Sequence, residues 1–266
     1  VVFGGQTILP TGYHPSGDIT VTSGLITISD ANFSAPNLTI SGGELNFGGI
    51  LTVSNLFNWS GGTLSGTGTT LVNGTLTMRG GAKALNAHTL RLSSGASGEW
   101  TGGLLYTFNN ATFDNQGSFA LRTNDTFGAN GTSIFNNSGT LTRDTGTGIV
   151  QILSAFNNSG TVNLLTGSLS LLGGGTSTGS FTEAAGTTMT FGGTHHLTNT
   201  TSLSGLGNIA FSYADFTDDG TYSLPGDITV TNNSNVTLNG TIATPNLTVS
   251  GGNLGGSGLM TVGNTF

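Results

Sequence analysis

The 266-residue sequence contains no cysteine, which excludes disulfide bonds, thiolate zinc sites and thiol catalysis. Charged residues make up only 6% of the chain, against roughly a quarter in an ordinary soluble domain. With five Lys and Arg residues and a net charge of −7, the chain lacks the dense basic surface that nucleic-acid binding requires. No apolar run reaches the roughly 18 residues of a spanning helix. We therefore expect neither a nucleic-acid partner nor a membrane span.

Small residues dominate what is present. Gly, Thr, Ser and Asn together account for 145 of the 266 residues. Gly costs roughly 1 kcal/mol relative to Ala inside a helix, and the other three are also poor helix formers. Short runs that alternate apolar residues with Thr or Ser, such as residues 19–22 and 169–171, have the period of a half-buried strand. The sequence therefore predicts an all-β protein.

A long internal repeat organises the chain. The segment Gly-Asp-Ile-Thr-Val-Thr at residues 17–22 returns unchanged 209 residues later, and residues 36–45 match residues 245–254 at eight of ten positions. We interpret residues 1–266 as a single continuous segment with one unit of about 209 residues, approximately 17–225, and the start of the next at 226–266. Such a segment is typical of a longer tandem array.

A shorter period lies inside the unit. Phe-Asn-Asn-Ser-Gly, or a close variant, occurs three times at intervals of 22 and 21 residues, and Trp followed by Ser or Thr and two glycines occurs twice, 41 residues apart. A period of about 20 residues is the length of one coil of a parallel β-helix, in which strands of successive coils stack about 4.8 Å apart. The predicted core columns contain Trp59, Trp100, Phe113, Phe135 and Phe156, and the predicted corner ladder contains Asn115, Asn137 and Asn158.

Residues 57–68, 156–162 and 192–197 resemble the β-strand repeats of very large bacterial exoproteins, which belong with the filamentous haemagglutinins and autotransporter passengers. The resemblance covers nearly the whole chain. It implies a right-handed parallel β-helix (a β-solenoid), export to the cell surface or the extracellular space, and a role in adhesion, surface layers or filaments.

The acidic residues offer one candidate for catalysis. Polysaccharide lyases and hydrolases with a β-helix fold need clustered carboxylates or a basic group around a groove. The one close acidic cluster consists of Asp215, Asp218 and Asp219. The last two align with Leu9 and Pro10 in the other copy of the repeat, so the repeat does not require them. A solvated loop of acidic turn formers explains them, and we expect no enzymatic activity and no catalytic residue.

The histidines argue against a metal site. His195 and His196 are adjacent on a predicted strand, so their side chains point to opposite sides, and His14 and His88 are isolated. The glycine run at residues 173–178 lacks the Asp of a calcium-binding repeat. The sequence therefore predicts no metal and no cofactor.

Two sets of side chains each admit a binding role and a structural one. The basic residues all fall in one half of the unit, either as a stripe for an anionic glycan or as scattered surface charge that limits lateral stacking. The aromatic residues either stack on sugar rings or belong to core columns and outer ladders. We favour the second interpretation of each set. The basic set is Arg79, Lys83, Arg91, Arg122 and Arg143, and the aromatic set is Trp59, Trp100, Tyr106, Tyr213 and Tyr222.

Low charge and near-identical tandem units predict a structural segment of an extracellular fibre, sheath or adhesin stalk that associates with copies of itself. The alternative is a glycan-binding adhesin module that uses lateral aromatic, Asn and Thr side chains, and an enzyme that acts on polysaccharides comes third. Residues 1–3 and 263–266 carry no Pro, charge or helical cap, so we expect another coil or subunit to cover each end.

Overall fold

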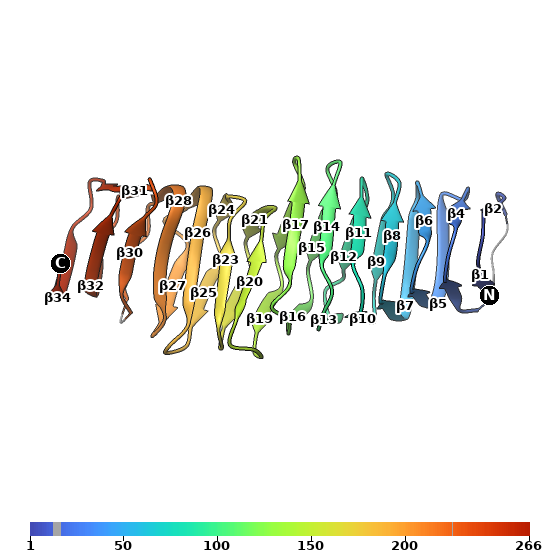
Figure 1. Cartoon of the computed structure of the whole chain (residues 1–266), viewed down its shortest axis with the longest axis horizontal. Helices are drawn as coiled ribbons and strands as arrows, with labels where there is room; N and C mark the ends of the chain where they lie inside the picture. The colour runs from blue at the N-terminus through green and yellow to red at the C-terminus, as the bar shows by residue number, and fades with distance from the viewer. Residues whose placement is uncertain (13–16, 225) are drawn as a thin grey trace.

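Gly and Asn interrupt the alternating apolar runs after about four residues, and the chain accordingly folds into short strands. The computed structural model describes residues 1–12, 17–224 and 226–266 and contains, within them, 34 β-strands and no helix. These strands stack in about 13 turns into an elongated rod with the termini at opposite ends (Figure 1). The predicted all-β fold, parallel stacking and coil length are confirmed. In this described part of the chain, no helix is long and apolar enough to cross a membrane.

Each full coil contributes one strand to each of three faces, which we number 1 to 3 in chain order. Strands on one face pair in parallel with those on the same face of the next coil, with one exception on face 1, where Ser202–Gly205 and Tyr222–Ser223 lie in contact without a paired register. Face 1 contains β1 (Val2–Phe3), β3 (Ile19–Val21), β10 (Thr75–Met78), β13 (Ser97–Trp100), β16 (Ser118–Leu121), β19 (Thr140–Arg143), β22 (Thr161–Leu164), β25 (Ser180–Glu183), β27 (Ser202–Gly205), β29 (Tyr222–Ser223) and β34 (Met260–Thr265). Face 2 contains β2 (Thr7–Leu9), β4 (Leu25–Ile28), β6 (Glu44–Phe47), β8 (Gly62–Ser65), β11 (Lys83–Asn86), β14 (Leu105–Phe108), β17 (Thr126–Asn130), β20 (Ile149–Ile152), β23 (Ser168–Leu171) and β30 (Ile228–Thr231). Face 3 contains β9 (Thr69–Val72), β12 (Thr89–Leu92), β15 (Thr112–Asn115), β18 (Ile134–Asn137), β21 (Ala155–Asn158), β24 (Gly175–Ser177), β31 (Asn235–Leu238) and β33 (Asn253–Gly255).

Five longer strands continue around a corner of the rod from one face to the next. At such corners the register with the neighbouring coil shifts, for example between Ala35 and Asn37. β5 (Asn32–Ile40) and β7 (Ile50–Trp59) run from face 3 to face 1, β26 (Thr188–Leu197) and β28 (Asn208–Asp218) from face 2 to face 3, and β32 (Ile242–Ser250) from face 1 to face 2.

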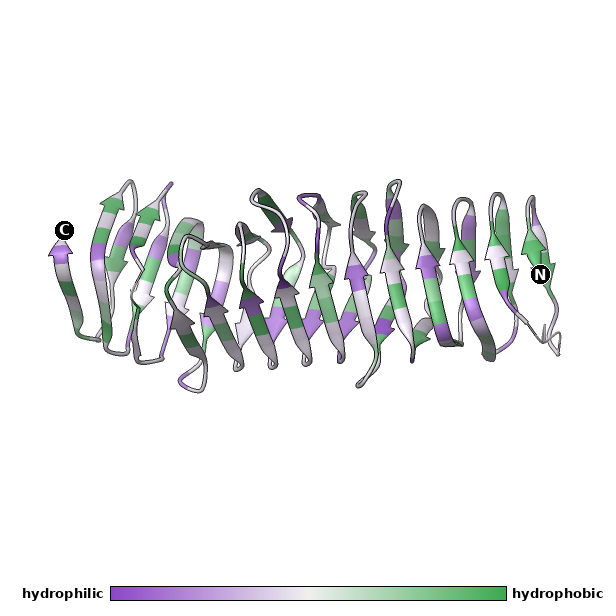
Figure 2. Ribbon diagram, turned by 90° about the horizontal axis from the view of Figure 1, so that it is seen from below, coloured by the Kyte–Doolittle hydropathy of each residue, from purple (hydrophilic) through white to green (hydrophobic). Residues whose placement is uncertain are grey.

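The core lies inside the rod because alternate residues of each strand point inward. In β16, Phe119 and Leu121 are buried, whereas Ser118 and Ala120 face outward. The same alternation of apolar and polar residues is visible along the strands of Figure 2. Burial of apolar surface in every coil is the main stabilising contribution to such a fold.

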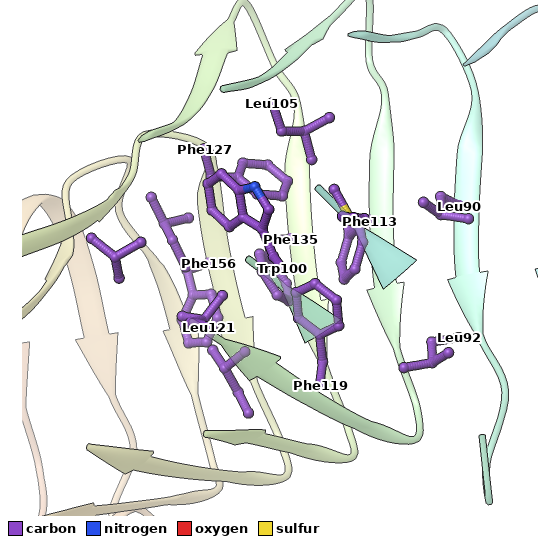
Figure 3. Close-up of a cluster of buried hydrophobic side chains, with 14 of the residues drawn as sticks. Leu90, Leu92, Trp100, Leu105, Phe113, Phe119, Leu121, Phe127, Phe135 and Phe156 are labelled. Atoms are coloured by element: carbon purple, nitrogen blue, oxygen red, sulfur yellow. The ribbon is translucent and has the colours of Figure 1, made fainter. Parts of the chain in front are cut away.

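The three predicted phenylalanines form one column on face 3. Phe113 pairs in register with Phe135, and Phe135 pairs with Phe156. Their ring centroids are 4.8 and 5.3 Å apart, and all three side chains are at most 1% exposed. Figure 3 shows them pointing into the interior, where Phe119 and Phe127 from the other two faces join them.

The predicted tryptophans share a different column, on face 1. Trp59 pairs with Met78 and Met78 pairs with Trp100, so the two indoles lie two coils apart on the same line. Both are fully buried. The Nε1 of Trp100 donates a hydrogen bond of 2.8 Å to the carbonyl of Gly103 at the corner that follows.

The predicted asparagine ladder lies at the end of the phenylalanine strands. Asn115 Nδ2 donates to Asn137 Oδ1 at 2.7 Å, and Asn137 Nδ2 donates to Asn158 Oδ1 at 2.8 Å. All three side chains are at most 1% exposed, so the hydrogen bonds between their amide groups are shielded from water. The next corner requires glycine, because a Cβ atom on Gly139 would collide with the carbonyl of Gly117 in the coil before it.

Candidate functional site

The acidic cluster does not form a shared surface site. Asp218 is the last residue of β28, is 1% exposed, and accepts hydrogen bonds from the Tyr222 hydroxyl at 2.5 Å and the Gly220 amide at 3.0 Å. Burial raises the pKa of Asp218 to about 6 and also raises the pKa of the Tyr222 phenol. The interpretation of Asp218 as a residue of a solvated loop is therefore wrong, because strand alternation turns it inward.

The other two carboxylates of the cluster point outward. Asp219 lies 2.8 Å from His196 Nε2 and accepts a hydrogen bond of 2.8 Å from Asn239, and these contacts, the first most of all, lower its pKa. Asp215 is exposed on β28. Since Asp218 and Asp219 face opposite sides of the wall, one substrate cannot contact both carboxylates.

The adjacent histidines lie on opposite sides of β26, as the alternation predicts. His195 is 1% exposed, packs against Phe191 and Phe216, and contacts the Leu171 carbonyl at 3.0 Å through Nε2. Its burial lowers the pKa to about 4. His196 is exposed and forms the contact with Asp219 described above.

His88 is also an interior residue. Its Nε2 lies 3.0 Å from Thr70 Oγ1, its Nδ1 lies 3.1 Å from the Gly66 carbonyl, and burial lowers its pKa to about 4. His14 lies outside the described residues. Over residues 1–12, 17–224 and 226–266, no three His, Asp or Glu side chains are grouped closely enough to hold a metal ion.

Two of the five basic residues are buried, which corrects the interpretation of the whole set as surface charge. Lys83 is 1% exposed, and its Nζ donates to the carbonyls of Gly81 at 2.8 Å and Gly102 at 2.9 Å. Desolvation lowers the pKa of Lys83 to about 8, although the nearby Asp125 carboxylate opposes this change. The ammonium group thus links the corners of two successive coils.

Arg143 has the same role further along the rod, at the same corner between faces 1 and 2. It is 1% exposed and donates to the Thr123 carbonyl at 2.6 Å, to Asn124 Oδ1 at 2.7 Å and to the Gly148 carbonyl at 3.0 Å. Desolvation lowers the pKa of this guanidinium. Both cations donate to main-chain carbonyls at the corners, and the Gly148 carbonyl accepts from the Ser168 amide as well.

The remaining basic residues do not form a free stripe. Arg122 forms ion pairs with Glu99 at 2.9 Å and Asp144 at 2.7 Å, and its hydrogen bond with Asp144 raises its pKa. Arg91 forms an ion pair of 2.6 Å with Asp114. These half-exposed pairs join coils that follow one another on the rod, so Arg91 and Arg122 are neutralised locally rather than presented to an anionic ligand. Arg79 is exposed in the turn after β10 and does not make a stripe by itself.

Glu183 is an interior residue that was not singled out from the sequence. It is 5% exposed, and its Oε2 has no hydrogen-bond partner among the described residues. Burial raises its pKa to about 8. The carboxyl group occupies space that a side chain at Gly207 would fill. Glu183 lies on the same side of its strand as the apolar Phe181, and this alternation was the sequence signal that predicts its burial.

The aromatic set divides into buried and exposed members. Trp59, Trp100 and Tyr222 are at most 8% exposed and belong to the interior. Tyr106 and Tyr213 are exposed by 47% and 69% of their surface. The preferred interpretation as core residues therefore applies to the first three, and only the two exposed tyrosines are available for contact with a ligand.

Tyr106 lies in a hollow on the outer surface. It faces outward from β14, and its register partner on β17 is Gly128, which has no side chain to fill the space beside the ring. The corners that follow β14 and β17 extend beyond those of the neighbouring coils in Figure 1. The resulting hollow has a volume of about 640 Å³ and is lined by Leu104, Tyr106, Phe108, Thr126, Asn130 and Leu153, among others.

A second hollow of about 370 Å³ lies on face 1, next to the ion pairs of Arg122.

Comparison of the chain with protein-family models, curated proteins and solved structures gave no match. Function is therefore argued from the fold and its surface. Three properties bear on it: the parallel stack of coils along the rod, the local pairing of Arg91 and Arg122, and the hollow beside Tyr106.

Proposed function

We propose that this chain is a structural segment of an extracellular bacterial surface fibre, sheath or adhesin stalk, and that it associates with copies of itself through solenoid stacking. The observation that carries the proposal is the parallel stack of coils that runs along the rod. Each coil bonds to the next through main-chain groups that any coil of the same shape supplies, so tandem units lengthen the rod without a new fold. The resemblance to bacterial exoprotein repeats supports the surface location.

The charge distribution supports lateral association. Seventeen charged residues are spread over 266, and the surface arginines Arg91 and Arg122 are already paired with carboxylates. Little long-range repulsion therefore opposes the approach of two rods. The few charged groups that strand alternation turns inward, such as Lys83 and Asp218, are not accessible to a substrate.

Electron microscopy of the purified protein is expected to show thin rods, fibres or bundles. Native material, in which the 209-residue unit is repeated, should show an axial repeat of about 50 Å, from roughly ten coils at about 4.8 Å each. Sedimentation of the assemblies should change little between low and high salt, because few exposed charges contribute. A monomeric, globular particle would contradict the proposal. So would cleavage of a polysaccharide that is lost in Asp218→Asn or Asp219→Asn.

The hollow beside Tyr106 favours a second function, binding of a neutral glycan. No charged residue lines it, one face is an exposed aromatic ring, and Thr126 and Asn130 contribute polar groups at its edge. A pyranose ring presents an apolar face that stacks on an aromatic side chain and hydroxyl groups that need hydrogen-bond partners. The volume falls in the usual range for small-molecule sites.

Substitution of Tyr106 tests this second function. On an array of neutral oligosaccharides, Tyr106→Ala should weaken retention about tenfold, which corresponds to the loss of one aromatic stacking contact. Tyr213→Ala, at the other exposed tyrosine, is the matched control and should bind as the unaltered protein does. Equal retention of both variants, or no retention of any glycan by the unaltered protein, excludes this site.

A further inference from the structure

The two copies of the repeated segment lie on different faces of the rod. The first copy of Gly-Asp-Ile-Thr-Val-Thr forms β3 on face 1, and the second forms β30 on face 2. In both copies this strand pairs with the segment 19 residues later. Ile19 is opposite Leu38, and Ile228 is opposite Leu247. The local stacking is thus conserved between the copies, while the face has changed.

The proline corner of the repeat has moved in the same direction. Pro36 lies at the corner between faces 3 and 1, where the register of β5 with β7 shifts. Pro245 lies at the corner between faces 1 and 2, where the register of β32 with β34 shifts. Strand and corner have both advanced by one face, so the displacement applies to the copy as a whole.

Coil counting explains the displacement. Ten steps along face 1 lead from β3 to β29, through β5, β7, β10, β13, β16, β19, β22, β25 and β27. The next copy then begins on the following strand, β30, which pairs with β28 on face 2. The 209-residue unit therefore spans ten coils and one additional face.

We propose that in an array of this repeat each unit presents its lateral surface one face further around the rod, so that three units display the same groups on all three sides. This inference rests on the proposed rod of tandem units. The groups concerned include the Arg122 ion pairs on face 1 and the hollow beside Tyr106 on face 2. The partner that such a surface fits is a further copy of the rod, approached from any of three directions, which favours bundles over flat ribbons.

The rotation determines the distance along the rod between equivalent groups that face the same flat partner. Three units contain 31 coils, or about 150 Å at about 4.8 Å per coil. A planar surface in contact with one side of the rod therefore meets a given group only once in about 150 Å, whereas the sequence repeats about every 50 Å.

A longer chain, in which further copies of the unit continue the repeat without a break in its register, tests the rotation. The full 266-residue chain, followed by two further copies of residues 58–266, contains three equivalents of Ser94, an exposed residue in the turn between β12 and β13. Because the sequence has no cysteine, Ser94→Cys in each copy supplies the only thiols for maleimide–gold labelling. Cryo-electron tomography of single rods then locates the three labels.

The control measures the twist of the rod within one unit. Asn199, in the turn between β26 and β27, lies at the same corner as Ser94 but five coils later. A single unit labelled through Ser94→Cys and Asn199→Cys should show both labels on one side of the rod, apart from the intrinsic twist of five coils.

After correction for that twist, labels of successive units should lie about 50 Å apart and be turned by about a third of a revolution. Labels in one line along the rod, or an extended chain that forms no continuous rod, overturn the inference. The measurement uses unassociated rods. Rotated labels on rods that never form bundles therefore uphold the rotation and count only against self-association.

Discussion

Replacing Phe135 with Ala is expected to lower the free energy of unfolding by about 3–5 kcal/mol. The ring is fully buried and lies between Phe113 and Phe156, with centroids 4.8 and 5.3 Å away, and 5.3 Å from Phe127 on face 2. Its removal leaves a cavity that the rigid hydrogen-bonded strands above and below cannot close by moving together. Both the apolar burial and the aromatic contacts are lost at this coil.

Chemical denaturation at about neutral pH, followed by the far-ultraviolet circular dichroism of the β-strands, measures this loss. Tyr106→Ala is the matched control, because it also truncates an aromatic residue but at a half-exposed position, and it should change stability by about 0.5 kcal/mol or less. A loss below about 1 kcal/mol for Phe135→Ala would show that the phenylalanine column does not stabilise the rod.

The period-two and coil-length patterns were sufficient to predict this column. Phe113 and Phe135 begin the same short motif, and residues that recur at the coil length occupy equivalent places on successive turns. The asparagine ladder follows from the same register, since Asn115 and Asn137 come two residues later on the same side of their strands. Local pattern and tertiary contact coincide here because each coil contacts mainly its neighbours.

Alternation also contained the signal for the buried charges. Lys83 lies on the same side of its strand as Leu85, and Glu183 lies on the same side as Phe181. The alternation of inward and outward residues alone therefore places both charged side chains in the interior. Lys83 was expected among scattered surface charges instead, in keeping with the general rule that Lys is almost never fully buried. That rule fails for Lys83 because two corner carbonyls lie within hydrogen-bond reach of the ammonium group.

Other features depend on contacts between coils that no single segment reveals. The hollow beside Tyr106 exists because Gly128 lies opposite it in the next coil, and this pairing depends on the lengths of the intervening corners. The same corner lengths determine that residues 226–231 fall on face 2 and not on face 1. Corner lengths vary from coil to coil, so small differences accumulate over ten coils into a change of face.

Glu183 should make the stability of the rod fall as the pH rises from about 4.5 to about 8. Its pKa is about 8 in the folded chain, against the ordinary value of 4.5. Below about pH 4.5 the carboxyl group is protonated in both states and imposes no penalty. Between these values the unfolded chain releases the proton while the folded chain retains it, which costs about 1.4 kcal/mol per pH unit. Above about pH 8 the full penalty, roughly 3–5 kcal/mol, remains.

Glu183→Gln removes this ionisation while it keeps the size of the side chain. The variant should match the unaltered protein near pH 4 and exceed its free energy of unfolding by roughly 3–5 kcal/mol near pH 9. Asp215→Asn, at an exposed carboxylate on β28, controls for the exchange of a carboxylate for an amide. His88, His195 and Asp218 also have displaced pKa values, but they are common to both proteins and cancel in the difference. Parallel stability curves from pH 4 to pH 9 would show that the Glu183 carboxyl is solvated, and that the wall of the solenoid is open at β25.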